Sequence, residues 1–225
     1  MILLGSAVNG AAIVAGTLAG MAVGKLLKEH IKSTLIAVMA LVSIGIAIPG
    51  LLDNQNALIP ILSLGIGSIL GELLDIDGKI TALGNFLQRH FKGHNSITDG
   101  FVTGSLVFAV GAMAIMGALD SGLKNDHSVL YAKALIDAVY SVVFATTMGI
   151  GVAFSGLTVF AVEGLMAVLA SLIAPLLSSY LITEITYIGS LLIIAISLNM
   201  LGITKLRILN MAPSLLLPIL LCQFM

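Results

Sequence analysis

The chain has 225 residues, of which 59% are hydrophobic and 9% are charged, and its mean hydropathy is +1.14. Soluble domains carry about 25% charged residues, so this chain has too few polar groups to cover a surface that faces water. The composition therefore predicts an all-α polytopic membrane protein with a single transmembrane domain, and it excludes a disordered chain, a collagen and a disulfide scaffold. The net charge of -1 offers no basic surface for nucleic acid.

Apolar segments long enough to cross a bilayer follow one another along the chain. A span needs about 20 mostly apolar residues. Eight spans are predicted, at residues 2–24, 34–52, 57–74, 100–120, 129–153, 157–179, 185–203 and 206–224. The fifth and sixth would be too long as one helix, so a break is predicted at Ser155–Gly156.

Glycines recur at every fourth position in three of these spans. Small residues at this spacing allow two helix backbones to approach closely in lipid. The seven glycines that follow it are Gly16, Gly20, Gly24, Gly67, Gly71, Gly100 and Gly104. Packing between helices of one chain is the favoured interpretation. A subunit interface, and with it a homodimer, stays open.

The longest polar connection covers residues 75–99. Its apolar residues fall at helical spacing, at Ile76, Ile80, Leu83, Leu87 and Phe91. This pattern is typical of an amphipathic helix that lies in the membrane interface. The alternative is a solvated loop.

The distribution of basic residues predicts how the chain is oriented. Cytoplasmic loops retain Lys and Arg. With the N-terminus outside, the inner side holds Lys25, Lys28, Lys32, Lys79, Arg89, Lys92, Lys205 and Arg207, and the outer side holds Lys124 and Lys133. Both termini are therefore expected outside the membrane, with residues 75–99 in the cytoplasm.

Weak internal similarity suggests an inverted repeat of spans one to three in spans six to eight. Asn56 and Pro60 open span three as Asn210 and Pro213 open span eight, and Gly104-Ser105-Leu106 of span four aligns with Gly189-Ser190-Leu191 of span seven. The topology makes both pairs of spans antiparallel, and spans one and six would complete the repeated unit. Transporters are often built from such repeats.

Three ionisable residues are predicted at membrane depth. Lys133 and Asp137 lie on one helix face, four residues apart, and Tyr140 continues that face. Charged residues inside a membrane are costly and usually functional. Lys133 and Asp137 are expected to line a cavity open to the outside, and Glu163 one open to the inside. An apolar surround favours the neutral form of a carboxyl group, which suits coupling to a proton or cation. The alternative is a buried ion pair, with Glu163 bonded to a neighbouring amide or hydroxyl.

Three asparagines also fall inside predicted spans. Asn9, Asn199 and Asn210 are expected to line the path of a solute, and Pro213 should free backbone carbonyls near Asn210. Hydrogen bonding between helices is the alternative for each asparagine.

Sequence motifs of the common enzyme classes do not occur. The chain has no P-loop, no His-Glu-x-x-His and no Gly-x-Ser-x-Gly, and all four histidines fall in predicted loops. We therefore expect no enzymatic activity, no cofactor and no bound metal.

Several motifs together resemble a family of bacterial inner-membrane proteins, domain of unknown function family 554. They are Val8–Gly10, Gly111–Gly117, Tyr131–Asp137, Gly149–Val152 and Asn210–Pro213. The resemblance covers essentially the whole chain. It implies a multi-pass protein of the bacterial plasma membrane, for which transport is commonly suggested.

Two residues depart from the family pattern. The resemblance leads us to expect glutamine at the position of Glu163 and glycine at that of Ser197. The departure at Glu163 puts in doubt a strictly required proton-carrying acid at this site, and the departure at Ser197 weakens the expectation of tight packing at that point.

The sequence as a whole predicts a transporter of a small solute or ion, coupled to a cation or a proton, with the lipid bilayer and a second copy of the chain as partners. The alternative is a membrane scaffold or regulator that does not transport and acts through contacts between helices.

Overall fold

The computed structural model describes residues 1–52, 56–82, 97–109, 111–175 and 177–222. The predicted all-α class is confirmed, since these residues form helices and no β-strand. The helices are α1 (Leu4–Gly24), α2 (Glu29–Leu52), α3 (Leu58–Leu74), α5 (Ile97–Ala109), α6 (Ala112–Lys124), α7 (Ser128–Met148), α8 (Gly151–Val168), α9 (Ala170–Ile173), α10 (Ser179–Met200), α11 (Ile208–Met211) and α12 (Leu217–Leu221), with a 3-10 turn, η1 (Ala212–Leu215).

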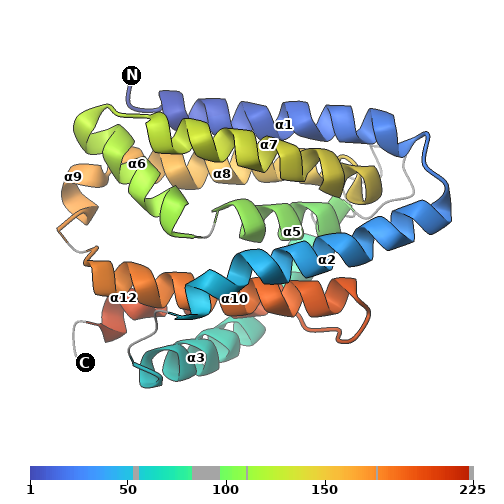
Figure 1. The fold of residues 1–225 in the computed structure, drawn as a ribbon. Coiled ribbons are helices and arrows are strands. Elements are labelled where there is room, and N and C mark those ends of the chain that lie inside the picture. Colours follow the sequence, from blue (N-terminus) through green and yellow to red (C-terminus); the bar gives the residue numbers. More distant parts are fainter. Residues whose placement is uncertain (53–55, 83–96, 110, 176, 223–225) are drawn as a thin grey trace.

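The helices form two groups that lie side by side (Figure 1). The first group contains α1, α7 and α8, with α5 and α6 packed against them. The second contains α2, α3 and α10, with the short C-terminal helices against α3 and α10. Both termini lie at the same end of the molecule, on the left of Figure 1.

Within the part of the chain that the structure describes, five helices are long and apolar enough to cross a membrane, and two bent pairs raise the number to at most seven. The eight predicted spans are therefore not confirmed. The difference lies at the C-terminus, where the predicted span 206–224 is instead a series of short helices within Ile208–Leu221. Pro213 and Pro218 fall at the starts of two of these pieces, because proline has no N–H to continue a helix.

The predicted break between the fifth and sixth spans is in the wrong place. Ser155 and Gly156 lie inside α8, and the turn falls at Gly149, whose φ is 65°. Glycine adopts this left-handed conformation without steric cost. Because the turn lies at Gly149, α8 begins at Gly151 and not near residue 157. The start of the next span was also misplaced, since α10 begins at Ser179 and not near residue 185.

The predicted fourth span, 100–120, is also corrected. It was expected as one helix, but it is divided into α5 and α6, with a bend of 63° between them. Gly111 has a φ of 132° and precedes the first residue of α6. A helix cannot continue through that conformation, so the carbonyl groups at the end of α5 lose their helical partners.

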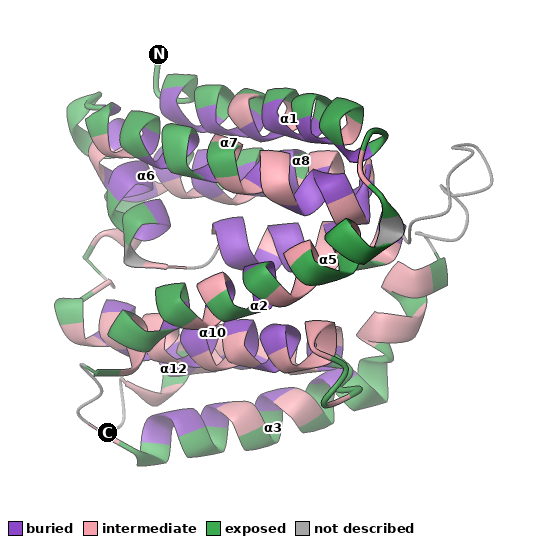
Figure 2. Cartoon of the chain, turned by 45° about the vertical axis from the view of Figure 1, so that its right-hand side comes forward, coloured by how far each residue is buried: buried purple, intermediate pink, exposed green. Residues whose placement is uncertain are grey.

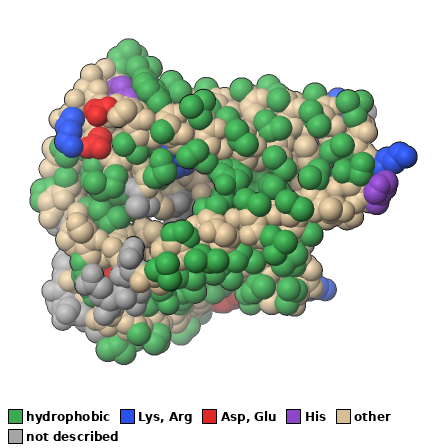
Figure 3. Space-filling view, viewed as in Figure 1, with side chains coloured by type: hydrophobic (Ala, Val, Ile, Leu, Met, Phe, Trp, Pro, Cys, Tyr) green, Lys and Arg blue, Asp and Glu red, His purple; other side chains and the backbone are tan. Residues whose placement is uncertain are grey.

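The surface of the molecule suits a lipid environment. Large hydrophobic side chains point outward from most helices, for example Leu41, Ile61, Leu135 and Leu157, each at least 63% exposed. Figure 2 shows exposed residues along the outer sides of α1 and α3, and buried residues where helices face one another. Hydrophobic side chains cover most of the face in Figure 3, with charged side chains mainly near its two ends.

The glycine ladder of α1 lies against α7. A Cβ added at Gly16 would lie 2.5 Å from the carbonyl oxygen of Ala138, and one at Gly24 would lie 2.7 Å from that of Thr146. The other five predicted packing glycines likewise face helices of the same chain: Gly20 meets α7, Gly67 and Gly71 meet η1 and α11, and Gly100 and Gly104 meet α8. These faces are occupied within the chain.

Part of the predicted connection 75–99 can be compared with the structure. Ile76–Ala82 is helical and follows α3 after a bend of 48°, and α5 begins at Ile97. Leu83, Leu87 and Phe91 lie outside the described residues. The amphipathic helix stays a prediction there, as does the inverted repeat.

Candidate functional site

Four of the predicted site residues meet in one buried cluster. Asn9 comes from α1, Lys133 and Asp137 from α7, and Glu163 from α8. Asn9 and Glu163 are fully buried, and Lys133 and Asp137 are 6% and 5% exposed. We call these four residues the polar cluster.

Close packing of three helices brings the polar cluster together. The glycine ladder draws α1 against α7, as described above. On its other side α1 meets α8 at Gly10 and Gly156, where a Cβ on Gly10 would lie 2.8 Å from the Gly156 carbonyl oxygen. Asn9 is the neighbour of Gly10, so this approach places its amide beside Glu163.

The Lys133 ammonium is the centre of the polar cluster. It forms an ion pair with Asp137, one turn along the same helix, and lies 3.7 Å from Glu163 Oε1. It also donates a hydrogen bond of 2.6 Å to the carbonyl oxygen of Phe108. Phe108 is close to the end of α5, where the break at Gly111 leaves carbonyl groups available, so the broken helix supplies a backbone ligand to the buried lysine.

Asn9 binds Glu163 through one side of its amide. Its Nδ2 donates to both carboxylate oxygens of Glu163, at 3.0 and 3.2 Å. The other side of the amide, Oδ1, is buried and accepts no hydrogen bond. Buried acceptors without a donor are rare and costly in folded proteins.

The polar cluster contains two carboxyl groups for one ammonium. Glu163 was expected in a cavity separate from Lys133 and Asp137, but the structure places all three together. Its hydrogen bond to the Asn9 amide is the arrangement that the structural alternative described. With all three groups ionised, the polar cluster would hold one negative charge without a counter-charge, which is costly away from water.

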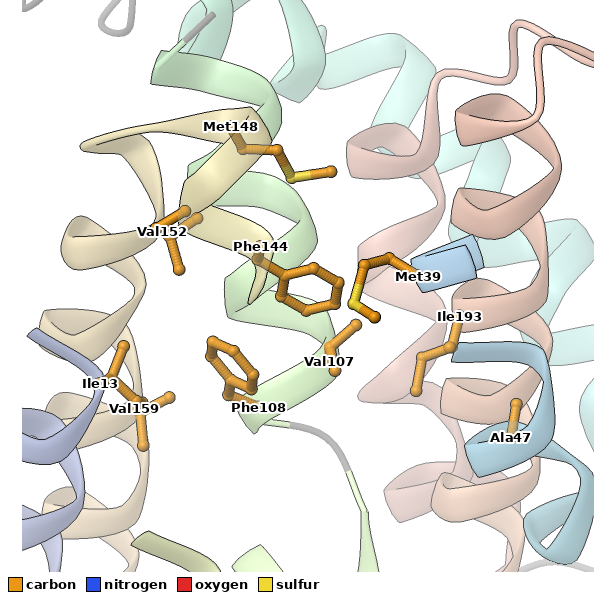
Figure 4. Packing of buried hydrophobic residues seen from close by; sticks show 11 residues of the cluster. Ile13, Met39, Ala47, Val107, Phe108, Phe144, Met148, Val152, Val159 and Ile193 are labelled. Atoms are coloured by element: carbon orange, nitrogen blue, oxygen red, sulfur yellow. The ribbon is translucent and has the colours of Figure 1, made fainter. Parts of the chain in front are cut away.

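An apolar layer lies beside the polar cluster, at the meeting of the two helix groups. Figure 4 shows Phe108, Phe144, Val107, Met39 and Ile193 converging from α5, α7, α2 and α10. The Phe108 and Phe144 rings are 5.9 Å apart. We call these five residues, together with Met148 and the partly buried Tyr140 that pack with them, the apolar layer.

Tyr140 belongs to this layer and not to the polar cluster. It is half-buried and stacks on Phe144, with ring centroids 6.4 Å apart.

A cavity of about 450 Å³ opens at the other side of the apolar layer. Its polar lining includes Asp77, Thr98, Asp99, Thr103 and Asn199, at the ends where α5 begins and α10 finishes. Met148 lines the cavity and also packs in the apolar layer. The cavity and the layer are therefore adjacent.

The two remaining asparagines fix loops near this cavity. Asn199 Nδ2 donates a hydrogen bond of 2.8 Å to the Leu206 carbonyl oxygen, and Oδ1 accepts one of 2.9 Å from the Leu206 N–H. These two bonds close the turn after α10. Asn210 accepts from the backbone N–H of Asp77 at 2.8 Å, while its buried Nδ2 has no hydrogen-bond partner. Asn199 lines the cavity, and its amide stabilises the local fold.

A second group of charges lies on the surface at this end. Arg207 donates to Glu72 at 2.8 Å and also binds Asp75, with Asp77 3.7 Å away. We call these four residues the surface cluster.

A buried glutamate outside the site and a backbone group within it were missed from the sequence. Glu184 is fully buried in α10, but it was expected outside the spans because the helix was predicted to begin at residue 185. The helix begins at Ser179, after the N-cap residue Ser178, whose side chain accepts from the Leu181 N–H. Ser178 after Pro175 is a helix-start signal that could have indicated this. The second missed feature is the Phe108 carbonyl, which accepts a hydrogen bond from Lys133. It is a backbone group, so the side chain at position 108 gives no indication of this role.

Comparisons with known proteins place the chain in a family. A family model described as "Protein of unknown function (DUF554)" matches residues 4–223. The chain is 29% identical over 220 residues to the "uncharacterized membrane protein YdfK" of Bacillus subtilis (strain 168), covering 96% of this chain and 94% of that protein. It is 28% identical over 220 residues to the "uncharacterized protein YqgA" of Escherichia coli (strain K12), covering 95% and 94%. No solved structure matches the chain. These matches confirm the resemblance seen in the sequence: the protein is a membrane protein that belongs to the DUF554 family.

Proposed function

We propose that this protein transports a small solute or ion across the bacterial plasma membrane, and that the polar cluster couples transport to a proton or a monovalent cation. The observation that carries the proposal is the buried excess of carboxyl groups, two for one ammonium, beside a broken helix. Intramembrane acids and interrupted helices are where transporters bind solutes and coupling ions.

The order of features along the molecule supports a path. The cavity, the apolar layer and the polar cluster follow one another between the two helix groups. Along α7, Asp137 and Thr147 of the cavity lining are separated by about 15 Å, at 1.5 Å per residue. This distance is about half of the hydrocarbon thickness of a bilayer. A solute in the cavity would thus have the apolar layer as its barrier.

The cavity lining favours a solute that is neutral or positively charged. Carboxylates, hydroxyls and an amide line it, together with apolar side chains, and the described lining includes no Lys or Arg. Its volume lies within the range of about 300–1,000 Å³ that is usual for small-molecule sites.

The remaining parts of the proposal concern the membrane and the oligomer. Both termini would lie outside, since the loops around Lys25–Lys32 and Lys205–Arg207 lie at the cavity end, where the basic residues predict the cytoplasm. A homodimer would need surfaces other than the seven glycines. The protein would act without a cofactor and without enzymatic turnover.

Charge movement by the purified protein in liposomes tests the proposal. Proton, sodium and potassium gradients are applied one at a time to wild type, to Asp137→Asn and to the matched control Asp120→Asn. Asp120 is also paired with a lysine four residues away, but it lies in α6, at 24% side-chain exposure. We expect a flux in wild type and in the control that is lost in Asp137→Asn. A folded wild-type protein that moves nothing under any gradient would contradict the proposal.

A scaffold or regulator without transport is the second candidate. The observation that favours it is the closed state of the polar cluster, in which no residue is more than 6% exposed. Such a protein would keep its polar cluster sealed under every gradient. Charge movement in liposomes and the reactivity of a cysteine placed in the apolar layer both separate the two candidates.

A further inference from the structure

We infer that Glu163 binds a proton, so that the cation taken up by the polar cluster is a proton and not a metal ion. The inference rests on the proposed function for its role in transport, but the proton site itself is argued from geometry alone. Three observations carry it: the charge count of the polar cluster, the position of the Lys133 ammonium, and the unpartnered oxygen of Asn9.

The charge count requires one more positive charge. The ionised side chains that face Glu163 are Lys133 and Asp137 from α7, and the neutral groups are the Asn9 amide from α1 and the Phe108 carbonyl from α5. Lys133 and Asp137 neutralise each other. A charged Glu163 would then stand fully buried with a neutral amide as its hydrogen-bond partner, and it would share the Lys133 ammonium, 3.7 Å away, with Asp137. A low-dielectric interior strongly disfavours this excess of negative charge.

The position of Lys133 argues for a proton over a metal ion. Its ammonium already contacts Asp137 and lies 3.7 Å from Glu163, so it occupies the space between the two carboxyl groups. A metal ion would need the same oxygens while lying beside this positive charge. Among the described residues no group of three or more His, Cys, Asp or Glu side chains is arranged to hold a metal.

Glu163 is the better proton acceptor of the two carboxyl groups. Asp137 has the closer contact with the ammonium, which stabilises its ionised form. Glu163 is farther from the ammonium and is 0% exposed.

The Asn9 amide is placed to bind both states of Glu163. In the ionised state Nδ2 donates to the carboxylate and Oδ1 accepts nothing. A hydronium ion gives up a proton by breaking one of its O–H bonds and leaves water, and the proton forms an O–H bond at one Oε of Glu163. No other covalent bond in the polar cluster breaks. Rotation of the amide then replaces the hydrogen bonds from Nδ2 with one in which Oδ1 accepts this O–H. The proton thereby removes the excess charge and supplies a donor to the buried acceptor, and its release restores the first state.

Infrared spectroscopy of the purified protein in liposomes tests the inference without any need for transport. Protonated carboxyl groups have a C=O band that is separate from that of carboxylates. The spectra compared are those of wild type, Glu163→Gln, Asp137→Asn and Glu184→Gln, near neutral pH. Glu184→Gln is the matched control, since Glu184 is also a fully buried glutamate, in the other helix group.

We expect a protonated carboxyl band that disappears in Glu163→Gln and persists in Glu184→Gln. The same band should disappear in Asp137→Asn, because a single carboxyl group beside the Lys133 ammonium would ionise. A role in packing alone would not produce this second loss. In Glu184→Gln with 13C-labelled glutamate, a shifted band is assigned to a glutamate other than Glu184 even if Glu163→Gln fails to fold, since the label shifts glutamate bands and leaves aspartate bands in place.

A band that is unchanged in folded Glu163→Gln, or a wild-type band that the glutamate label does not shift, overturns the inference. So does a sodium-driven flux that wild type and Glu163→Gln share. If the band behaves as expected but no gradient produces a flux, the proton site stands and the proposed transport function fails. If flux depends on Asp137 while the band is absent, the transport function stands and the proton site fails.

Discussion

The polar cluster and the surface cluster contain similar chemistry in opposite surroundings. Each has one basic side chain that binds two or more carboxyl groups. Lys133 and its acids are at least 93% buried as side chains, whereas Arg207, Glu72 and Asp75 are 46%, 52% and 58% exposed. Water and salt screen the surface cluster, so its excess of acid is tolerated at little cost. The same excess inside the molecule has to be met by a proton or another cation, and for this reason we place function in the polar cluster.

Removal of the buried lysine should have the largest effect on stability, because only the polar cluster holds its carboxyl groups away from water. Lys133→Met leaves two carboxyl groups buried without their cation, which we expect to lower the free energy of unfolding by about 3–5 kcal/mol. Unfolding in mixed micelles measures this change, with Lys124→Met, at an exposed pair, as the control. The double variant Lys133→Met/Asp137→Leu should recover part of the loss. Equal effects of the two single variants would contradict the assigned difference.

A change in the packing of α1 against α7 should disturb the polar cluster and leave the surface cluster unchanged. Only the polar cluster depends on this contact. In Gly16→Ala the new Cβ would meet the Ala138 carbonyl oxygen at 2.5 Å, so a helix backbone has to move. We expect a loss of about 1–3 kcal/mol in the free energy of unfolding.

Gly45→Ala is the matched control, since nothing lies within 4 Å of a Cβ at that position in α2. It should be neutral, or stabilising by up to about 1 kcal/mol through helix propensity. Similar losses in both variants would show that the contact between α1 and α7 is looser than described.

Removal of the surface cation should have a small effect. We expect Arg207→Gln to lower the free energy of unfolding only slightly at low salt, since exposed ion pairs contribute little. The change should vanish at high salt, because the interaction is screened. A loss as large as that of Lys133→Met would remove the distinction between the two clusters.

The smallest effect concerns an exposed carboxylate at the start of α7. The backbone N–H of Ser128 and then its hydroxyl donate to Asp126, and these bonds lower the pKa of this carboxyl below its ordinary value. A lowered folded-state pKa gives stability that is present above the unfolded pKa and is lost as pH falls through the folded pKa. In Ser128→Ala we expect the pKa of Asp126 to rise and this acid-range dependence to shrink, as an NMR titration in micelles would show. An unchanged titration would contradict the role of the hydroxyl.

Local patterns in the sequence predicted much of the fold and half of the polar cluster. The apolar segments located the long helices, and the spacing of four residues paired Lys133 with Asp137 on one helix face. The seven glycines were correctly placed at close helix contacts. These features depend on neighbours in the sequence, so they can be derived from it.

Contacts between distant segments could not be derived in this way. Asn9 and Glu163 are separated by 154 positions, and only the packing of α1 against α8 brings them together. Glu163 was therefore expected in a different cavity from Lys133. The turn after α7 was misplaced for a related reason: both Gly149 and Gly156 were available, and tertiary packing decided that Gly149 takes the left-handed conformation while Gly156 lies against Gly10.

In the proposed mechanism the cavity and the polar cluster belong to one path, and the apolar layer closes it. Labelling of a cysteine in that layer tests whether this path exists. In a Cys222→Ser background, Val107→Cys places a thiol in the layer, and Val159→Cys places one in the same hydrophobic core at a fully buried position in α8. With protein in liposomes and a water-soluble thiol reagent, we predict that a proton gradient makes Val107→Cys reactive and leaves Val159→Cys unlabelled. A Val107→Cys thiol that stays unreactive under proton, sodium and potassium gradients would contradict the path and favour a sealed scaffold.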